Sequence, residues 1–265
     1  GIRDPLWSRG LGDVYKRQNQ YCISSKKDGF VVGISGGIDS ALTSTLCALT
    51  SKKTICLSMP INQNTNQIER ANEHIRFLKK QFKNVVSIDL NLSDSFKHFK
   101  TELSKYCNSE ISFVNSKSRL RMVSLYCIAQ EKNVLVAGTG NKVEDFGIGF
   151  YTKYGDGGVD LSPIADLMKS QVKKLAEFLN ISKNIIEAPP TDGLWDNDKT
   201  DEQQIGATYD ELEWAMNFEI SENKLTSRQR EVLRIYRKFN QSNTHKMLPI
   251  PVCKIPGELI SLNSN

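Results

Sequence analysis

The sequence predicts an α/β protein with a Rossmann-like, doubly wound parallel sheet of about five strands and helices on both faces. Short apolar runs alternate with longer segments of helical period through most of the chain. Strand–helix–strand units of this kind cross over with a right hand, so the strands run parallel and both faces of the sheet become covered. Ligands of such sheets bind beyond the carboxyl ends of the strands.

The apolar patterns place the individual elements. Strands are expected at 30–34, 54–58, 85–88 and 134–137. Helices are expected near 39–51, 66–82, 115–132, 168–180, 201–218 and 227–240. Residues 140–166 are rich in glycine and lack a clear period, so we expect a long functional loop there.

Residues 1–18 show neither a helical nor a strand period. Within them, Asp13-Val-Tyr-Lys-Arg-Gln18 looks like a translated sequencing adapter. We therefore expect residues 1–18 to be a non-native addition that replaces the true N-terminus. Residues 19–265 are expected to form one domain, since this length suffices to bury a complete core.

Composition excludes several classes of protein. No apolar run approaches the roughly 20 residues that span a bilayer, so no membrane partner is expected. The net charge of +5 is mild and suits small polyanionic substrates, and no nucleic-acid partner is expected. The six cysteines form no Cys-x-x-Cys pair and no metal-ligand spacing, which indicates a reduced, cytoplasmic protein.

The most informative motif is the run Phe30-Val-Val-Gly-Ile-Ser-Gly-Gly-Ile-Asp-Ser40. Its order predicts a buried strand, a tight glycine turn and the start of a helix. Such a turn directs backbone N–H groups outward at the positive end of a helix dipole, which favours a phosphate. We interpret residues 33–40 as a phosphate loop, although neither a Walker A motif nor a dinucleotide fingerprint is present. An ordinary strand-to-helix turn is the alternative.

Asp39 lies inside the phosphate loop, where two interpretations compete. Asp and Ser are preferred at helix N-caps, so Asp39 could be a cap, a role that Ser40 could fill as well. A carboxylate beside bound phosphates would be repelled unless a cation lay between them. A Mg²⁺ ligand is therefore the favoured interpretation of Asp39.

Two further blocks of polar residues follow the strand expected at 134–137. Gly138-Thr-Gly-Asn-Lys-Val-Glu144 should face the same crevice as the phosphate loop. There Glu144 is a candidate second metal ligand, and Thr139 is a candidate nucleotide contact. Phe150-Tyr-Thr-Lys-Tyr-Gly-Asp-Gly-Gly-Val-Asp160 combines charged residues with glycines, as suits a loop that closes over a ligand.

These motifs carry a family resemblance. The first loop resembles the SGGxDS pyrophosphate loop of the N-type ATP pyrophosphatases. The order SGGIDS, GTGNKVE, FYTKYGDGGVD and SPIADLMKSQV resembles ammonia-dependent NAD synthetase from about Asp28 to Pro256. The resemblance implies that ATP adenylates the carboxylate of nicotinic acid adenine dinucleotide (deamido-NAD) and releases pyrophosphate. Ammonia then displaces AMP to give NAD.

The resemblance also implies roles for individual residues. It implies that ATP is bound by Gly33, Ser35, Gly36, Gly37, Ser40, Thr139, Lys169 and Thr191. It implies that Mg²⁺ is bound by Asp39 and Glu144, and deamido-NAD by Arg119, Lys153, Asp160, His245 and Lys246. Lys169 would act in catalysis by holding the phosphates. From the chemistry of the second step, in which ammonium must lose a proton before it attacks, Asp156 is a candidate to hold the ammonium ion. The arginine that usually follows His245-Lys246 in the family is Met247 here.

A homodimer is expected, with the dinucleotide site completed at the interface. The helix that carries Arg119 and Arg121 has a wider apolar surface than one sheet-facing stripe requires. That surplus could belong to the core instead. The family resemblance favours a two-fold contact between copies of this helix.

Two other functions stay open as alternatives. The chain could be another N-type ATP pyrophosphatase, either an amidotransferase synthetase domain or an RNA thiolation enzyme. An RNA enzyme should show an added RNA-binding domain or a basic stripe, and neither is visible. A non-catalytic nucleotide-binding module would have no use for two acidic metal positions and a lysine downstream. No nitrilase-like glutaminase domain is visible, so free ammonia is the expected nitrogen donor.

Overall fold

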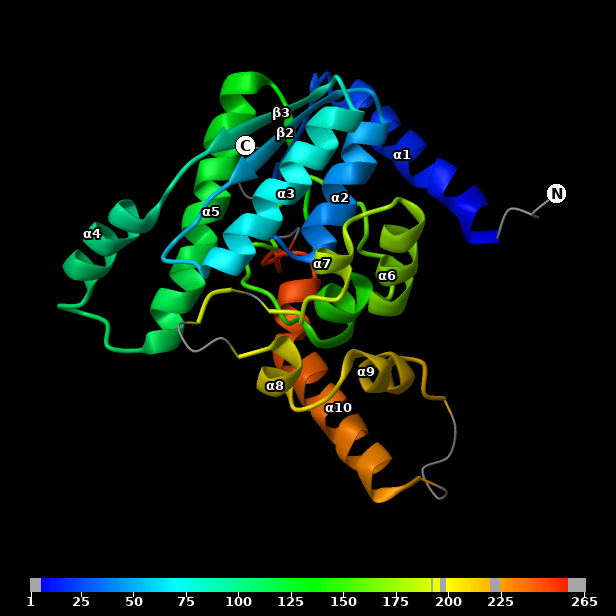
Figure 1. Ribbon diagram of the computed structural model, residues 1–265. Helices are drawn as coiled ribbons and strands as arrows, with labels where there is room; N and C mark the ends of the chain where they lie inside the picture. Colours follow the sequence, from blue (N-terminus) through cyan, green and yellow to red (C-terminus); the bar gives the residue numbers. More distant parts are fainter. Residues whose placement is uncertain (1–5, 192, 196–198, 220–224, 257–265) are drawn as a thin grey trace, which may run out of the picture.

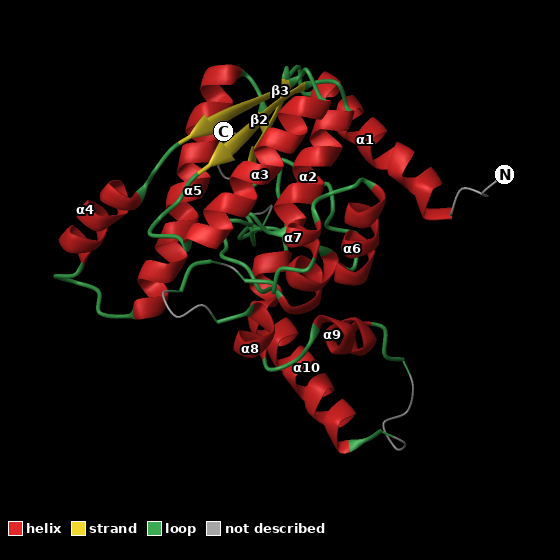
Figure 2. Cartoon of the chain, in the orientation of Figure 1, coloured by secondary structure: helices red, strands yellow, loops and turns green. Residues whose placement is uncertain are grey.

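The computed structural model describes residues 6–191, 193–195, 199–219 and 225–256, and it shows a sheet between helices (Figures 1 and 2). The described strands lie in the order β3-β2-β1-β4, and every neighbouring pair is parallel. Their bounds are Gly29–Gly33 (β1), Lys53–Ser58 (β2), Val85–Asp89 (β3) and Leu135–Val136 (β4). The predicted α/β fold with a parallel sheet is confirmed.

The described residues form four strands where about five were expected. Beside β4, a single parallel bridge joins Ala137 and Leu161. The Asp160 carboxylate accepts a hydrogen bond from the Val136 N–H at 2.8 Å, which a backbone carbonyl would accept in a regular ladder. The segment around Asp160 therefore continues the sheet by one bridge and does not become a fifth strand.

Helices cover both faces of the sheet. Helices α2 (Ile38–Leu49) and α3 (Thr65–Gln81) lie on one face, and α4 (Ser93–Leu103) and α5 (Glu110–Lys132) lie on the other (Figure 1). Alternate residues of β1 pack on opposite faces of the sheet. Phe30 and Val32 pack with residues of α2 and α3, whereas Val31 packs with residues of α4 and α5. A strand buried on both faces explains the continuous apolar run in the sequence.

The second half of the chain adds two smaller groups of helices. Helices α6 (Lys169–Phe178) and α7 (Lys183–Ile186) pack against α2. A π-helix, η1 (Val143–Ile148), packs with the helices that lie below the sheet in Figure 1. These are α8 (Asp201–Ile205), α9 (Tyr209–Met216) and α10 (Ser227–Met247). Both groups surround the carboxyl ends of the strands, where ligands of such sheets bind.

Several predicted elements are corrected by the structure. The single helix expected at 201–218 is two helices, because Gly206 ends α8 with φ +87° and Thr208 starts α9. The Thr208 side chain accepts from the Glu211 N–H, and the Glu211 side chain accepts from the Thr208 N–H. This reciprocal capping box makes a new start more favourable than continuation. The loop expected at 140–166 contains η1, and α4 and α7 were not predicted.

The N-terminal segment is helical. Helix α1 (Leu6–Ser24) extends away from the body towards the N-terminus (Figure 1). The expectation that residues 1–18 form neither a helix nor a strand is therefore wrong for the described part. Gln18 is buried, yet neither its Oε1 nor its Nε2 has a hydrogen-bond partner among the described residues.

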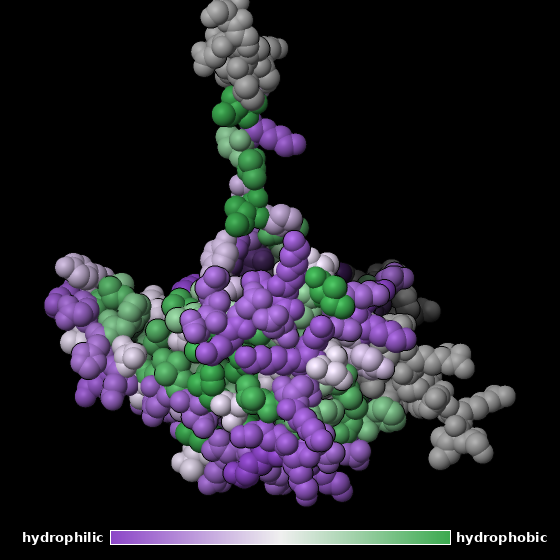
Figure 3. Space-filling model, turned by 90° about the horizontal axis from the view of Figure 1, so that it is seen from above, coloured by the Kyte–Doolittle hydropathy of each residue, from purple (hydrophilic) through white to green (hydrophobic). Residues whose placement is uncertain are grey.

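The tail after α10 is apolar and exposed. Leu248, Ile250 and Val252 are 59%, 66% and 79% exposed. Viewed from above, this tail stands off the surface as a narrow, mostly hydrophobic segment (Figure 3). Among the helices of the described residues, none combines the length and the apolar character needed to cross a membrane.

A buried histidine links α3 to the start of α2. His74 Nε2 lies 3.0 Å from the Ser44 Oγ, and Ser44 Oγ donates to the Ser40 carbonyl at 2.7 Å. His74 is 1% exposed, and burial lowers its pKa to about 4. The imidazole is therefore neutral at physiological pH, and it braces the helix that follows the phosphate loop.

We predict that His74 makes the fold sensitive to acid. The unfolded histidine has a pKa near 6.5, so between about pH 6.5 and 4 the unfolded chain binds a proton that the folded chain excludes. Stability from this group is present above pH 6.5 and is lost as the pH falls, by roughly 3 kcal/mol at full protonation. Urea unfolding of wild type and His74→Gln from pH 7 to pH 4 measures this difference. Parallel pH profiles for the two proteins would contradict the prediction.

Candidate active site

A cavity of about 510 Å³ lies at the carboxyl ends of β1 and β4. In chain order, β2 and β3 are added on one side of β1, and the chain then crosses over to add β4 on the other side of β1. The crevice at such a reversal is the usual ligand site of a doubly wound sheet. The walls come from the phosphate loop, the segment after β4, the middle of α5, the start of α6 and the segment before α8.

The phosphate loop has the tight geometry that its glycines predicted. Gly36 has φ +85°, and a Cβ there would lie 2.3 Å from the Gln67 carbonyl oxygen. The Ser40 Oγ accepts from the Ser35 N–H and donates to the Gly37 carbonyl, which closes the turn. Gly33, Ser35, Gly37 and Ser40 line the cavity, and Gly36 supports the loop from behind, where its carbonyl accepts from Arg70 Nε at 3.1 Å.

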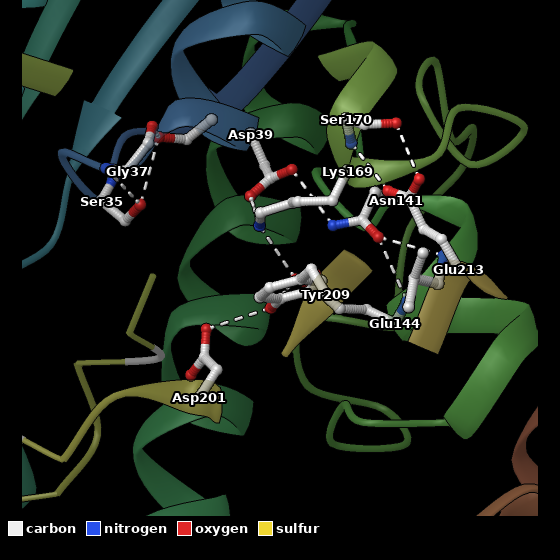
Figure 4. Close-up of polar contacts among 12 residues, drawn as sticks. Ser35, Gly37, Asp39, Asn141, Glu144, Lys169, Ser170, Asp201, Tyr209 and Glu213 are labelled. Atoms are coloured by element: carbon white, nitrogen blue, oxygen red, sulfur yellow. Dashed lines mark hydrogen bonds and ion pairs between the residues drawn. The ribbon is translucent and has the colours of Figure 1, made fainter. Parts of the chain in front are cut away.

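Three charged side chains meet beside this loop, and we call Asp39, Glu144 and Lys169 the charge cluster. The Lys169 Nζ lies 2.6 Å from Asp39 Oδ2 and 3.0 Å from Glu144 Oε1 (Figure 4). The three side chains are 12–19% exposed. Asp39 comes from α2, Glu144 from η1 and Lys169 from α6, so the fold brings together residues that are far apart in the sequence.

The charge states of the cluster follow from its geometry. Burial alone would lower the pKa of Lys169, but the two carboxylates raise it above its ordinary value. Burial acts to raise the pKa of Glu144, but Lys169 and the Tyr209 hydroxyl together bring it below its ordinary value. For Asp39, burial outweighs Lys169 and raises the pKa. Lys169 is therefore cationic and Glu144 anionic at neutral pH.

Two neighbours orient the carboxylates. Asn141 is fully buried, and its Nδ2 donates to Asp39 Oδ1 at 3.2 Å. Its Oδ1 accepts from the N–H groups of Val143 and Glu144, so the same side chain fixes the start of η1. The Tyr209 hydroxyl donates to Glu144 Oε1, and the Tyr209 ring lies 4.6 Å from the Lys169 Nζ.

Helix α9 supports the cluster at two points one turn apart. Tyr209 contacts Glu144 and Lys169, and Glu213 reaches the start of α6 (Figure 4). The Glu213 carboxylate accepts from the Ser170 N–H at 2.8 Å and from Ser170 Oγ at 2.7 Å. A carboxylate at a helix N-terminus is stabilised by the free N–H groups there. Glu213 thereby fixes the backbone next to Lys169.

The carboxylates of the cluster fit a magnesium ion that is shared with a bound phosphate. Among the described residues, no group of three or more His, Cys, Asp or Glu side chains could hold a metal. Mg²⁺ in nucleotide sites commonly takes one or two carboxylates and completes its shell with phosphate oxygens and water. Asp39 and Glu144 supply such oxygens beside the phosphate loop, and both now contact Lys169.

Asp156, Thr139 and Thr191 also line the cavity. The Asp156 carboxylate accepts from Ser118 Oγ at 2.7 Å and from the Thr152 N–H at 3.0 Å. Burial raises its pKa. A second acid, Asp145, lines the cavity as well, and burial together with the charges of Glu144 and Asp156 raises its pKa to about 8. This wall of the cavity is therefore acidic.

The five residues expected to bind the dinucleotide do not line this cavity. The Asp160 carboxylate accepts from Val136 N–H and Tyr126 hydroxyl at the edge of the sheet. Lys153 Nζ donates to the His245 carbonyl at 2.7 Å, and Arg119 Nε donates to the Lys153 carbonyl. Lys246 Nζ donates to the carbonyls of Gly149 and Tyr151. Four of the five thus join the end of α10 to the 149–153 segment and α5.

Sequence reasoning missed four residues that build the site. Asn141 stands in the GTGNKVE motif, where its amide was a visible signal for a polar contact. Arg70 lies on a predicted helix, and the sequence gives no signal for its contact with the Gly36 carbonyl, because that contact depends on tertiary structure. Tyr209 and Glu213 are four residues apart on one helix, which indicates a shared face and nothing about chemistry.

Comparison with known proteins identifies relatives over most of the chain. The family profile described as NAD synthase matches residues 13–249. The protein named NH(3)-dependent NAD(+) synthetase from Sulfurisphaera tokodaii is 33% identical, over 94% of this chain and 89% of its own length. The protein of the same name from Mycoplasmopsis pulmonis is 42% identical over 71% of each chain.

Two solved structures of similar fold carry different names. NMN synthetase from Francisella tularensis has a TM-score of 0.84 and 28% identity, over 95% of this chain and 100% of that chain. NH3-dependent NAD synthetase from Campylobacter jejuni has a TM-score of 0.77 and 25% identity at the same coverage.

We predict that the Tyr209 hydroxyl is needed to hold Glu144. Tyr209→Phe keeps the ring beside Lys169 and removes one donor to a buried carboxylate, which should lower the free energy of unfolding by about 1–3 kcal/mol. Nucleotide binding, measured by titration calorimetry with ATP, should weaken in the same variant. Tyr126→Phe is the matched control, since Tyr126 donates to Asp160 outside the cavity. Equal nucleotide affinities in the two variants would contradict the prediction.

Proposed function

The chain belongs to the NAD synthase family and is an enzyme of the ligase class, and we propose that it converts deamido-NAD to NAD with ATP and ammonia. The observation that carries this proposal is the charge cluster beside the phosphate loop. It places a lysine and two carboxylates where the phosphates of a nucleotide would enter. The names and coverage of the relatives support the choice of reaction.

The proposed reaction has two steps. The nicotinate carboxylate oxygen attacks the α-phosphorus of ATP, and the bond to pyrophosphate breaks. Ammonia then attacks the carbonyl carbon of this adenylate, the bond to AMP breaks, and a proton leaves the new amide. In-line displacement at phosphorus depends on position and on neutralised charge. The phosphate loop would orient the pyrophosphate, and Lys169 would hold the phosphate oxygens.

Mg²⁺ is the proposed metal, with Asp39 and Glu144 as its protein ligands. When bound, it would neutralise negative charge that develops on the phosphates. Asn141 and Tyr209 would keep the two carboxylates in place. Thr139 and Thr191, which also line the cavity, would contact the rest of the nucleotide.

Asp156 is the proposed ammonium site. It lies in the cavity wall, where Ser118 and Thr152 fix its carboxylate. An ammonium ion would stabilise the charged form of an acid whose pKa is raised by burial. In that position the carboxylate would hold the nitrogen close to the adenylate until it loses a proton.

NMN formation is a second candidate function. The solved structure with a TM-score of 0.84 bears the name NMN synthetase. In addition, Arg119, Lys153, Asp160, His245 and Lys246 lie outside the cavity, so none of the five contacts a second nucleotide within it. A mononucleotide substrate would need fewer such contacts.

A homodimer would supply the missing wall of a dinucleotide site. On α5, Val123 is 57% exposed and Cys127 is exposed as well. Leu120, Leu125, Tyr126 and Ile128 pack against the sheet, so only part of the apolar surface of α5 is used within the subunit. We propose that the remainder meets a second copy.

We also propose that residues 19–265 form the enzyme domain and that residues 1–18 are a non-native addition. The adapter-like run from Asp13 to Gln18 supports this proposal. A cytoplasmic location is proposed from the six free cysteines.

The proposed reaction predicts specific products. With ATP, Mg²⁺ and ammonium, deamido-NAD should yield NAD, AMP and pyrophosphate, and chromatography should detect no ADP. Nicotinic acid mononucleotide in place of deamido-NAD should be used at least about tenfold less efficiently, and the reverse preference would establish the second candidate.

In the same assay, Asp156→Asn should slow amide formation more than adenylate formation. Equal loss of both half-reactions would remove the ammonium role.

The proposed dimer predicts a mass of about twice 29.9 kDa in sedimentation at micromolar concentration. Val123→Glu places a charge in the proposed contact and should shift the protein to monomer, with weaker binding of deamido-NAD. Ile111→Glu is the matched control, because Ile111 is 48% exposed in the first turn of the same helix. A wild-type monomer with full affinity for deamido-NAD would contradict the proposal.

A further inference from the structure

One ammonium group takes the place between two carboxylates that the proposed function gives to a metal. Lys169 Nζ contacts Asp39 Oδ2 at 2.6 Å and Glu144 Oε1 at 3.0 Å. Figure 4 shows the lysine side chain reaching between the two acids from the start of α6. A divalent cation bound between the two acids would compete with the Lys169 ammonium group for the same space and for Asp39 Oδ2 and Glu144 Oε1.

The surroundings of Lys169 favour a cation at this point. The Tyr209 ring faces Nζ at 4.6 Å, and Asn141 and Tyr209 hold the two carboxylates on either side. Without a cation, two buried carboxylates would lie close together with little water to screen their repulsion. The lysine therefore offsets one of the two negative charges in the free protein, and a metal bound between the acids would have to displace it.

A nucleotide changes this balance. Its phosphates would enter beside the phosphate loop and bring oxygens of high negative charge within reach of a flexible lysine chain. The ammonium group could then leave the carboxylates for the phosphates without losing its ion pairs. The same phosphates supply the remaining oxygen ligands that Mg²⁺ requires.

We propose that Lys169 is the resident counter-ion of Asp39 and Glu144, which keeps Mg²⁺ out of the free enzyme and yields its place only when ATP arrives. This inference rests on the proposed function, in which the two acids are metal ligands. Metal and nucleotide then enter together, and each raises the affinity for the other by the same factor.

Removal of the lysine should have an unusual effect on metal binding. Mn²⁺ serves as a paramagnetic substitute for Mg²⁺. In the absence of nucleotide, Lys169→Met should bind Mn²⁺ at least about tenfold more tightly than wild type, because the competing ammonium group is gone. The loss of free Mn²⁺ signal in electron paramagnetic resonance measures this directly. Lys173→Met is the matched control, since Lys173 lies one turn further along α6 and also lines the cavity. It should bind Mn²⁺ as wild type does.

Wild type provides a second, independent measurement. With α,β-methylene-ATP present, and after correction for Mn²⁺ held by the nucleotide alone, wild type should bind Mn²⁺ at least about tenfold more tightly than without it. Lys169→Met should show little of this coupling. Thermal unfolding gives the same contrast. Mg²⁺ alone should raise the Tm of Lys169→Met and leave the Tm of wild type unchanged.

The outcomes separate this inference from the function on which it rests. If free wild type binds Mn²⁺ as tightly as Lys169→Met, the counter-ion role is overturned while the metal site stands. If wild type binds no Mn²⁺ even with α,β-methylene-ATP, the metal assignment fails and the inference fails with it. Lys169→Gln, which keeps an N–H donor and removes the charge, replaces Lys169→Met if that variant does not fold.

Discussion

The ion pairs of Lys169 with Asp39 and Glu144 constrain much of the surrounding structure. Buried charges are tolerated only when partners lie within contact distance, so α2, η1 and α6 must meet at one point. The contacts of Asn141, Tyr209 and Glu213 then follow as the means of holding these three elements together. The helices below the sheet are thus part of the site, since α9 contributes two of these three side chains.

The charge cluster also requires the backbone after β4 to pack closely against neighbouring side chains. A Cβ at Gly140 would lie 2.2 Å from the Asp145 carboxylate, and one at Gly138 would lie 2.9 Å from the Val159 side chain. These glycines let the segment after β4 turn tightly into η1, which brings Glu144 towards the cavity. The wider turn of a π-helix often marks a functional position in other proteins, and here it carries an acid of the charge cluster.

The parallel strands, helices α2, α3 and α5 and the phosphate loop were predictable because they depend on local patterns. Apolar runs of four or five residues located the four strands of the described residues, and Ser35-Gly36-Gly37 located the phosphate loop. The contacts between the end of α10 and the 149–153 loop were not predictable. Lys153 donates to the His245 carbonyl and Lys246 donates to carbonyls of the loop only because the fold brings the two segments together. Tyr209 was missed for the same reason, because its role arises from the packing of α9 against η1.

The strand order also determines when the sheet can close as the chain is made. β1 pairs with β2 on one side soon after synthesis, but its other partner, β4, follows about one hundred residues later. At ordinary rates of translation this interval lasts roughly 5 to 20 s. During that time β1, whose first four residues are buried in the finished fold, has an open edge, and an open edge can pair with other nascent chains. The segment from α2 to α5 must therefore protect β1 before the residues after β4 exist.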